Sequence, residues 1–271
     1  MSRFYSPQGD PMIQIPTKDG KRLKQATIVD AKANGWYASV STISGIVKES
    51  DFLTAWKVSQ HLDAAKGTEK LLGQNHEIWK QRVRSDAEKA MSRAPELGTA
   101  VHNVVEQYQR IRTLGGDFND IKVDRKDLMP YLAAIHEFSE THGIKARDKD
   151  SLEKRIVIPE ARTAGTCDFI GQFGKHKVAV LDWKTQKVRK EPWYYFNFPL
   201  QLAAYWRGMG GKGQIISVII DTSGHDSYSV KKRQLPQISF KIYERPLDWY
   251  NHFLDLSKIY YLMNNWPHKE D

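Results

Sequence analysis

Cysteine is almost absent from this sequence of 271 residues, because Cys167 is the only one. A single cysteine excludes an internal disulfide framework and any zinc or iron–sulfur site that needs several thiolates. A catalytic metal would therefore need oxygen and imidazole ligands, which Mg²⁺ and Mn²⁺ accept. The scarcity of cysteine also favours a reducing, intracellular compartment.

Long apolar stretches are lacking as well. No run approaches the ~18 to 20 apolar residues that a membrane-spanning helix needs. The first residues, MSRFYSPQGDPMIQIP, have neither the basic start and apolar stretch of a secretory signal nor the Arg-rich helix of a transit peptide. We find no internal repeat and no low-complexity tract. These absences predict a soluble protein of the cytoplasm.

The charge of the chain is strongly basic. The formal net charge is +9, and the isoelectric point is near 9.4. This balance favours a polyanionic partner, either nucleic acid or an acidic membrane surface. Since no apolar run supports membrane insertion, nucleic acid is the preferred partner. A hydrophobic content of 40% is enough to bury a full core, in one large domain or two small ones.

Hydrophobic periodicity changes from helical to strand-like along the chain. Residues 1–38 predict irregular or short hairpin structure, and Ser41 and Thr42 offer N-caps to a short helix. The expected helices then cover residues 52–65, 73–93, 97–111, 125–142, 199–209 and 246–264. The expected strands cover residues 152–158, 166–173, 178–184, 214–221 and 237–243.

This order predicts an α/β (α+β) fold with a central mixed sheet flanked by helices. We expect residues 1–95 to form a helical N-terminal part and residues 96–271 to form the core. Together they would make one compact unit.

Asp168, Asp182 and Lys184 form the constellation that predicts chemistry. Asp182 and Lys184 are two residues apart on one expected strand, so both side chains project from the same face. If residues 174–176 form a three-residue hairpin loop, Asp168 lies opposite Asp182, with Cβ atoms about 4.5 to 5.5 Å apart. Two carboxylates that close repel each other unless a proton or a cation lies between them. A hard divalent cation suits such a pair.

The alternative reading is an ordinary ion pair on the protein surface, which an isolated DxK sequence usually forms. The preceding residues 178–181 are apolar on both faces of the strand, which favours a buried strand and a cleft. An ammonium group beside a metal suits phosphodiester hydrolysis, because it stabilises charge on the phosphate or orients the nucleophile.

Several short motifs resemble a known family. The sequence GTCDFIG at 165–171 precedes LDWKTQ at 181–186 and QLAAY at 201–205, and GTAVHNVVE lies upstream at 98–106. In this order they resemble the RecB-type exonuclease branch of the PD-(D/E)XK nuclease superfamily. The segment VSTISGIV at 40–47, followed by Trp56 and Lys57, is similar to mitochondrial genome maintenance exonucleases and related phage enzymes.

The resemblance implies a PD-(D/E)XK, restriction-endonuclease-like core and a role for each matching residue. His102, Asp168 and Asp182 would be metal ligands, together with the backbone carbonyl of Trp183. Lys184 would be the catalytic lysine. Gln201 and Tyr205 would lie beside Lys184, and their i, i+4 spacing places both on one helix face. Two further acidic residues are candidates for supporting positions around the metal, namely Glu153 and Glu106.

A segment that mixes basic and aromatic residues follows the catalytic motif and predicts a path for DNA. Its basic side chains could follow phosphates while its rings stack on bases, or the rings could simply cover the core. Its members are Lys187, Arg189, Lys190, Trp193, Tyr194, Tyr195 and Phe196. A basic helix face further upstream could form another wall or be ordinary solvated charge, and it consists of Lys80, Arg82, Arg84, Lys89 and Arg93.

The expected function is a Mg²⁺- or Mn²⁺-dependent DNA exonuclease without an iron–sulfur cluster. It would act on single-stranded DNA or DNA ends in replication, recombination or repair, in a host cytoplasm if a phage encodes it. One alternative is a structure- or sequence-specific endonuclease of the same superfamily. The other is a DNA-binding protein without catalysis.

Overall fold

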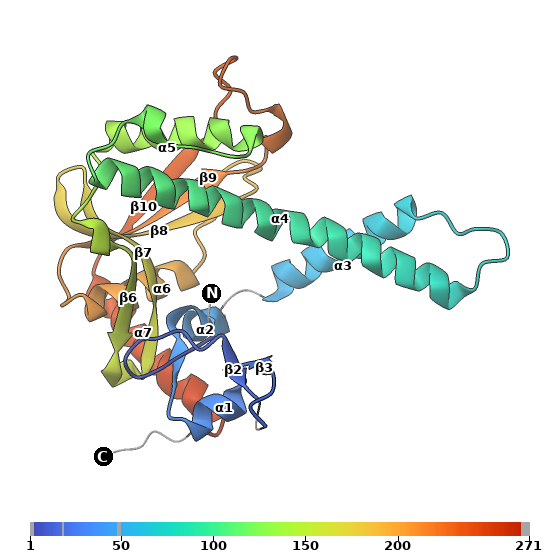
Figure 1. The fold of residues 1–271 in the computed structure, drawn as a ribbon, viewed down its shortest axis with the longest axis horizontal. Coiled ribbons are helices and arrows are strands. Elements are labelled where there is room, and N and C mark those ends of the chain that lie inside the picture. The colour runs from blue at the N-terminus through green and yellow to red at the C-terminus, as the bar shows by residue number, and fades with distance from the viewer. Residues whose placement is uncertain (1–2, 18, 48–49, 267–271) are drawn as a thin grey trace. The chain divides into compact units, whose positions relative to one another are not determined.

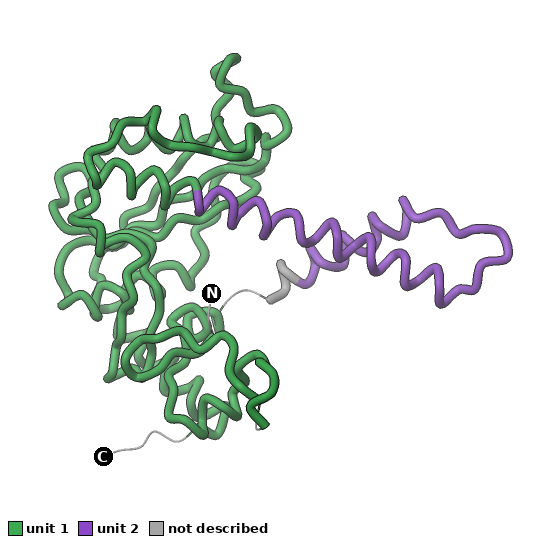
Figure 2. The backbone as a smooth tube through the Cα atoms, viewed as in Figure 1, with its two compact units in different colours: residues 1–48, 104–271 green, residues 49–103 purple. Residues whose placement is uncertain are grey.

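A computed structural model describes residues 3–17, 19–47 and 50–266 of the chain. It consists of two compact units, Met1–Lys48 with Val104–Asp271 (unit 1) and Glu49–Asn103 (unit 2), shown in Figure 2. The sequence predicted a division between residues 95 and 96 instead. Among the described residues, no helix combines the length and apolarity needed to cross a membrane.

Unit 1 is built on a mixed sheet. Its main path runs β1–β4–β7–β8–β9–β10, and β5 and β6 also pair with β7. The central strands are β6 (Leu152–Ile158), β7 (Thr163–Phe173), β8 (His176–Gln186), β9 (Gln214–Asp221) and β10 (Ile238–Tyr243). Strand β8 is antiparallel to β7 and parallel to β9, and β10 is antiparallel to β9. The predicted central mixed sheet is therefore confirmed.

Helices cover both faces of this sheet (Figure 1). On one face, Phe138 of α5 (Met129–Thr141) contacts the Trp183 ring, with the ring centroids 6.1 Å apart. On the other face lies α6 (Asn197–Gly208), against which α7 (Pro246–Met263) packs. Gly208 permits a close approach of α6 to β6, because a Cβ at this position would lie 2.2 Å from Ile156 Cγ2. The predicted mixed α/β class with flanking helices is confirmed.

The N-terminal part of unit 1 contains more regular structure than the sequence indicated. Strands β1 (Phe4–Tyr5) and β4 (Tyr37–Ser39) extend the main sheet, with the short helix α1 (Ile28–Ala33) between them. Strands β2 (Gln14–Pro16) and β3 (Leu23–Gln25) form a separate hairpin, and β5 (Lys145–Ala146) pairs with β7.

The short helix α2 (Val40–Ser44) begins earlier than expected. Its N-cap is Ser39, whose hydroxyl accepts a hydrogen bond from the Thr42 amide at 3.0 Å. The prediction of Ser41 and Thr42 as caps is therefore wrong, because Ser39 supplies the capping oxygen at the end of β4.

Unit 2 consists of α3 (Ser50–Gly67) and the first part of α4 (His76–Thr113). The Trp79 indole donates to the Thr68 carbonyl at 2.9 Å, and Thr68 donates to Asp86 at 2.9 Å, so α4 is tied to the end of α3. The expected helices 73–93 and 97–111 are one continuous helix that contains Pro95. Separating them was wrong. Proline removes one backbone donor, but the helical residues on both sides of it continue the same helix.

Candidate active site

A buried ion pair lies at the centre of the predicted site. Asp182 is only 2% exposed, in the middle of the sheet on β8. Lys184 Nζ donates a hydrogen bond to Asp182 Oδ1 at 2.8 Å. The second carboxylate oxygen, Oδ2, is also 2.8 Å from Nζ, but the angles of this contact do not make it a hydrogen bond. Because both residues belong to one strand and are two positions apart, they lie on the same sheet face. The ion pair is therefore set by the strand itself.

Asp168 lies opposite this pair. The pairing of Phe169 with Leu181 on β7 and β8 places Asp168 opposite Asp182 one step further on. The Asp168 carboxylate accepts a hydrogen bond from the Trp183 amide at 2.9 Å. The sequence predicted this register, but not the turn that produces it.

The hairpin turn contains only Gly174 and Lys175, because Phe173 already pairs with His176. The predicted three-residue loop is therefore wrong. A β-bulge, in which two residues of β8 face one residue of β7, restores the register before the site is reached.

The electrostatics of the three groups are coupled. Burial raises the pKa of Asp168 well above its usual range, and the neighbouring Asp182 raises it further. Lys184 and the Trp183 amide oppose this effect. Burial lowers the pKa of Lys184, but the attraction of Asp182 and Asp168 is stronger, so its pKa is raised overall. Lys184 is thus held as an ammonium ion beside two carboxylates that repel each other.

These residues fit a divalent cation. Asp182 Oδ2 is a buried oxygen that accepts no hydrogen bond, and the Asp168 carboxylate lies across from it. In the described part of the chain, no group of three or more His, Cys, Asp or Glu side chains is arranged to hold a metal. One or two carboxylates, with water and phosphate oxygens as the other ligands, is the way proteins commonly hold Mg²⁺.

Glu153 adds a further negative charge. The register of β6 and β7, with Leu152 opposite Phe169, puts Glu153 opposite Asp168. Its φ of 49° is a left-handed conformation that is uncommon outside glycine. Burial, followed by repulsion from Glu106 and Asp182, raises the pKa of Glu153 to about 7. Glu106 lies on the last turns of α4 and forms an ion pair with Arg110 at 2.7 Å.

Two side chains of α6 complete the surroundings of the lysine. Gln201, which is buried, lies with its Oε1 3.5 Å from Lys184 Nζ. Tyr205 is also buried. A Cβ added to Gly165 of β7 would lie only 2.7 Å from the Tyr205 hydroxyl oxygen, which is too close. Glycine at position 165 thus makes room for the Tyr205 ring. The structure brings Asp168, Asp182, Lys184, Gln201 and Tyr205 together.

Two hydroxyls beside this cluster were not anticipated from the sequence. Ser217 of β9 pairs in register with Asp182, and its fully buried Oγ has no hydrogen-bond partner. Tyr243 of β10 has a buried hydroxyl that also lacks a partner with hydrogen-bond geometry, and burial raises its pKa, which the nearby Ser217 opposes only in part. Only the pairing of β8, β9 and β10 reveals these neighbours, because no local motif marks them.

The basic and aromatic segment after β8 divides between two roles. Lys187, Arg189 and Lys190 are exposed, and the Trp193 side chain is 59% exposed. Tyr194 and Tyr195 are half-buried, and Tyr195 packs edge-on against Phe198 with the ring centroids 5.4 Å apart. The basic residues and Trp193 therefore face solvent and Tyr195 covers the core, and the path for DNA stays a prediction.

Apart from Phe196, which is exposed in unit 1, the remaining predicted residues belong to unit 2. His102 is half-buried on α4, in the second unit, and its role as a ligand stays a prediction. In the basic helix face, two of the residues have acidic neighbours: Lys80 lies 2.9 Å from Glu77, and Lys89 lies 3.8 Å from Asp86.

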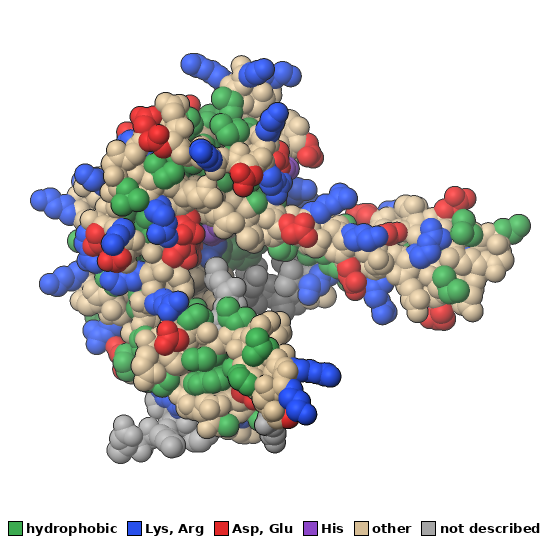
Figure 3. All heavy atoms as spheres, in the orientation of Figure 1, with side chains coloured by type: hydrophobic (Ala, Val, Ile, Leu, Met, Phe, Trp, Pro, Cys, Tyr) green, Lys and Arg blue, Asp and Glu red, His purple; other side chains and the backbone are tan. Residues whose placement is uncertain are grey.

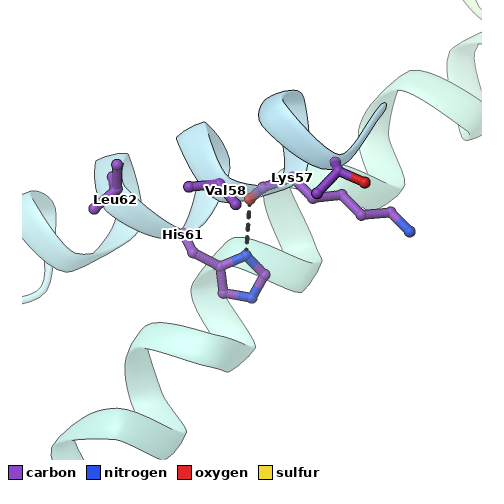
Figure 4. A pocket seen from close by; sticks show the side chains of 5 residues that line it. Lys57, Val58, His61 and Leu62 are labelled. Atoms are coloured by element: carbon purple, nitrogen blue, oxygen red, sulfur yellow. Dashed lines mark hydrogen bonds between the residues drawn. The ribbon is translucent and has the colours of Figure 1, made fainter. Parts of the chain in front are cut away.

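Unit 2 also has a shallow groove on α3, shown in Figure 4. It is lined by Thr54, Lys57, Val58, His61 and Leu62. His61 Nδ1 lies 2.9 Å from the Lys57 carbonyl oxygen. Since the groove has no carboxylate, it offers no alternative metal site.

Cys167 is an inert core residue. Its side chain is fully buried, and burial raises the pKa of its thiol well above the usual value. A protonated thiol without access to solvent is a poor nucleophile.

No protein-family model matches this chain, and no curated protein matches it significantly. The relationship to the PD-(D/E)XK superfamily therefore stays a prediction from the motifs.

Replacing Asp168 with asparagine should stabilise the protein in the absence of metal. The Asp168→Asn change removes the repulsion between the two carboxylates and keeps an oxygen for the Trp183 amide. In EDTA at pH 8, we expect a higher free energy of unfolding than in the parent, measured by urea denaturation. Mn²⁺ at about 100 times its Kd should stabilise the parent by about 2.7 kcal/mol and the variant hardly at all. The exposed Asp226→Asn change is the control, and an equal Mn²⁺ effect in Asp168→Asn would contradict the metal site.

Glu153 should make the folded state less stable as the pH rises. Its folded pKa of about 7 lies above the usual 4.5, so the folded state binds this proton more tightly than the unfolded state. Its contribution to stability is therefore lost as the pH rises from about 4.5 to about 7. Urea denaturation in EDTA should show Glu153→Gln gaining stability relative to the parent over this range. Parallel pH profiles for the two proteins would contradict the raised pKa.

Proposed function

We propose that this chain is a Mg²⁺- or Mn²⁺-dependent nuclease that hydrolyses phosphodiester bonds in DNA, and that unit 1 is its PD-(D/E)XK-type core. The observation that carries the proposal is the buried Asp182–Lys184 pair with Asp168 opposite it. An ammonium held beside two repelling carboxylates serves no ordinary stabilising purpose, since an apolar core would avoid these desolvation costs. The arrangement suits a cation and a phosphate that arrive together.

Each of these groups has a separate task in the proposed reaction. Asp168 and Asp182 would hold the cation, which when bound would acidify a water molecule and reduce the charge on the phosphate. Lys184, kept charged by Asp182, would stabilise the negative charge that develops on the phosphate as water attacks phosphorus. Gln201 would fix the position of the ammonium group. The P–O bond to the leaving oxygen would then break, with the attacking water losing one proton to the solvent and the leaving oxygen taking one up from it.

Two further ligands belong to this proposal on the motif resemblance alone. His102 would contribute an imidazole and Trp183 its backbone carbonyl. Neither is required for the two carboxylates to attract a cation, so the metal can be tested without them.

DNA is the proposed substrate because the chain carries a net charge of +9 and exposes Lys187, Arg189, Lys190 and Trp193 directly after the catalytic strand. Lysine and arginine bind phosphates, and an exposed ring can stack on an unpaired base. Exonuclease action on single strands or DNA ends follows from the motif resemblance. The alternatives are an endonuclease of the same superfamily and a DNA-binding protein without catalysis.

Lys184→Ala should abolish cleavage and leave DNA binding nearly unchanged. Loss of the ammonium should reduce kcat by about 100- to 1,000-fold, as expected for removal of a transition-state donor. Cleavage of end-labelled DNA in Mg²⁺ measures the rate, and fluorescence anisotropy in EDTA measures binding. Lys177→Ala, an exposed lysine on the same strand, is the matched control. Cleavage by Lys184→Ala at the parent rate would reject the site, and a parent that binds DNA without cleaving it would establish the non-catalytic alternative.

Linear and circular substrates separate the two modes of cleavage. An enzyme that needs a free end should degrade linear single-stranded DNA and spare closed single-stranded circles of the same sequence. Gel analysis with Mg²⁺, Mn²⁺ or EDTA gives the result, and EDTA should stop all cleavage. Rapid cleavage of the circle in Mg²⁺ would show an endonuclease instead.

A further inference from the structure

A second basic segment follows β9 and is not part of the site described above. Residues 229–234 form a short hairpin, in which the Ser229 amide donates to the Gln234 carbonyl at 2.8 Å and the Gln234 amide donates back at 2.9 Å. We call these residues the basic hairpin. Its tip carries three consecutive exposed cationic side chains, Lys231, Lys232 and Arg233.

The basic hairpin starts from the same sheet edge as the segment after the catalytic lysine. Strands β8 and β9 are parallel, and their last register pair is Gln186 with Asp221. Parallel strands end at a common edge, so both following segments leave the sheet there. The Asp221 carboxylate accepts hydrogen bonds from the Val188 amide at 3.0 Å and from the Ser223 amide at 2.7 Å. One side chain thus ties the starts of the two segments together.

The connection between β9 and the basic hairpin is held against the body of unit 1. The Tyr228 hydroxyl donates to the Asp221 carbonyl at 3.3 Å, and the Tyr131 ring of α5 packs edge-on against Tyr228. The Tyr131 hydroxyl lies 3.2 Å from His225 Nδ1, and His225 Nε2 lies 3.3 Å from Asp127. These contacts fix the base of the basic hairpin to the end of the sheet and to α5.

The charge on both segments is uncompensated. Many surface arginines of unit 1 have a carboxylate partner, for example Arg112 with Glu140 and Arg207 with Glu160. Within the described ranges, no ion pair involves the basic side chains of these two segments, which are Lys187, Arg189, Lys190, Lys231, Lys232 and Arg233. Figure 1 shows the loop between β9 and β10 extending beyond α5, and Figure 3 shows Lys and Arg side chains gathered on it.

We propose that the basic hairpin binds the sugar–phosphate backbone of the DNA strand, several nucleotides away from the bond that is cleaved. Lys187, Arg189 and Lys190 would hold the phosphates nearest Lys184, and the basic hairpin would hold more distant ones. Six unpaired cations on two segments that one carboxylate fixes together match a polyanion with regularly spaced charges. This inference rests on the proposed nuclease function, but DNA binding tests it independently of cleavage.

Charge reversal at the tip tests the inference. The triple variant Lys231→Glu, Lys232→Glu, Arg233→Glu is compared with Lys175→Glu, Lys177→Glu, Lys212→Glu. The control residues are also exposed: Lys175 lies in the β7–β8 turn, Lys177 at the start of β8 and Lys212 before β9, all at the opposite edge of the sheet. The change in net charge is the same in both variants, so a difference between them reports position alone.

The measurement is the Kd for a 30-nucleotide single strand, by fluorescence anisotropy in EDTA over a range of salt concentrations. The hairpin variant should raise Kd by at least about 10-fold in low salt. The slope of log Kd against log salt should fall by about 2, as expected for three lost phosphate contacts on a single strand. The control variant should stay near the parent.

Equal losses in the two variants, or none in either, would overturn the inference, as would a parent that binds no DNA. Weakened binding to vesicles containing anionic phospholipid, with DNA binding unchanged, would overturn it in favour of a membrane surface. A parent that binds DNA through the basic hairpin but does not cleave it in Mg²⁺ would uphold this inference and refute the nuclease proposal.

Discussion

The contact on which the site depends is the ion pair between Asp182 and Lys184 inside the sheet. Neither charge is stable there alone, since removing a carboxylate or an ammonium from water costs several kcal/mol. The strand places the two groups on one face, and β7 and β9 on either side of β8 bury Asp182. Burial alone lowers the pKa of Lys184, and only the carboxylates reverse this. The lysine therefore remains an ammonium ion because of its neighbours.

The ion pair does not balance the charge around it. Glu153 on β6 lies opposite Asp168 on β7, which lies opposite Asp182 on β8, and burial followed by repulsion between these acids raises the pKa of both Asp168 and Glu153. A structure selected for stability alone would replace at least one of these acids. Retention of such unfavourable charge is typical of functional sites, where local stability is given up for ligand binding. On the proposed function, the excess negative charge would attract a cation, and the ammonium would leave a positive group for a phosphate.

Much of this could be predicted from the sequence, and the failures have physical causes. Strands 152–158 and 214–221 were predicted with their observed bounds, because the second is apolar along most of its length and the first ends in the apolar run Ile156–Ile158 directly before Pro159. The residues that the structure brings together were predicted from strand spacing and motifs, and they are Asp168, Asp182, Lys184, Gln201 and Tyr205. The β-bulge beyond Gly171 and the helix that continues through Pro95 depend on tertiary context that local signals do not carry. Ser217 lies in an apolar strand without a motif, so only the pairing of the strands shows that it neighbours Asp182. Lys231 to Arg233 look like an ordinary solvated loop until the structure shows at which edge of the sheet this loop begins.

The distribution of charge at this sheet edge joins the two proposals. An acidic centre repels phosphate at close range, so without a cation a DNA strand would be attracted by the basic segments and rejected by the carboxylates. On the proposed function, a bound cation would reverse the local sign and leave the strand attracted along its whole path. Under the two proposals, affinity at a distance would depend on the exposed lysines and arginines, and contact at the centre would depend on the carboxylates and on Lys184, which lies beside Asp182 inside the site. The position of Asp221 fits this division, because its carboxylate accepts hydrogen bonds from the Val188 and Ser223 amides, where the chain leaves β8 and β9, and within the described residues it forms no ion pair with a lysine or arginine.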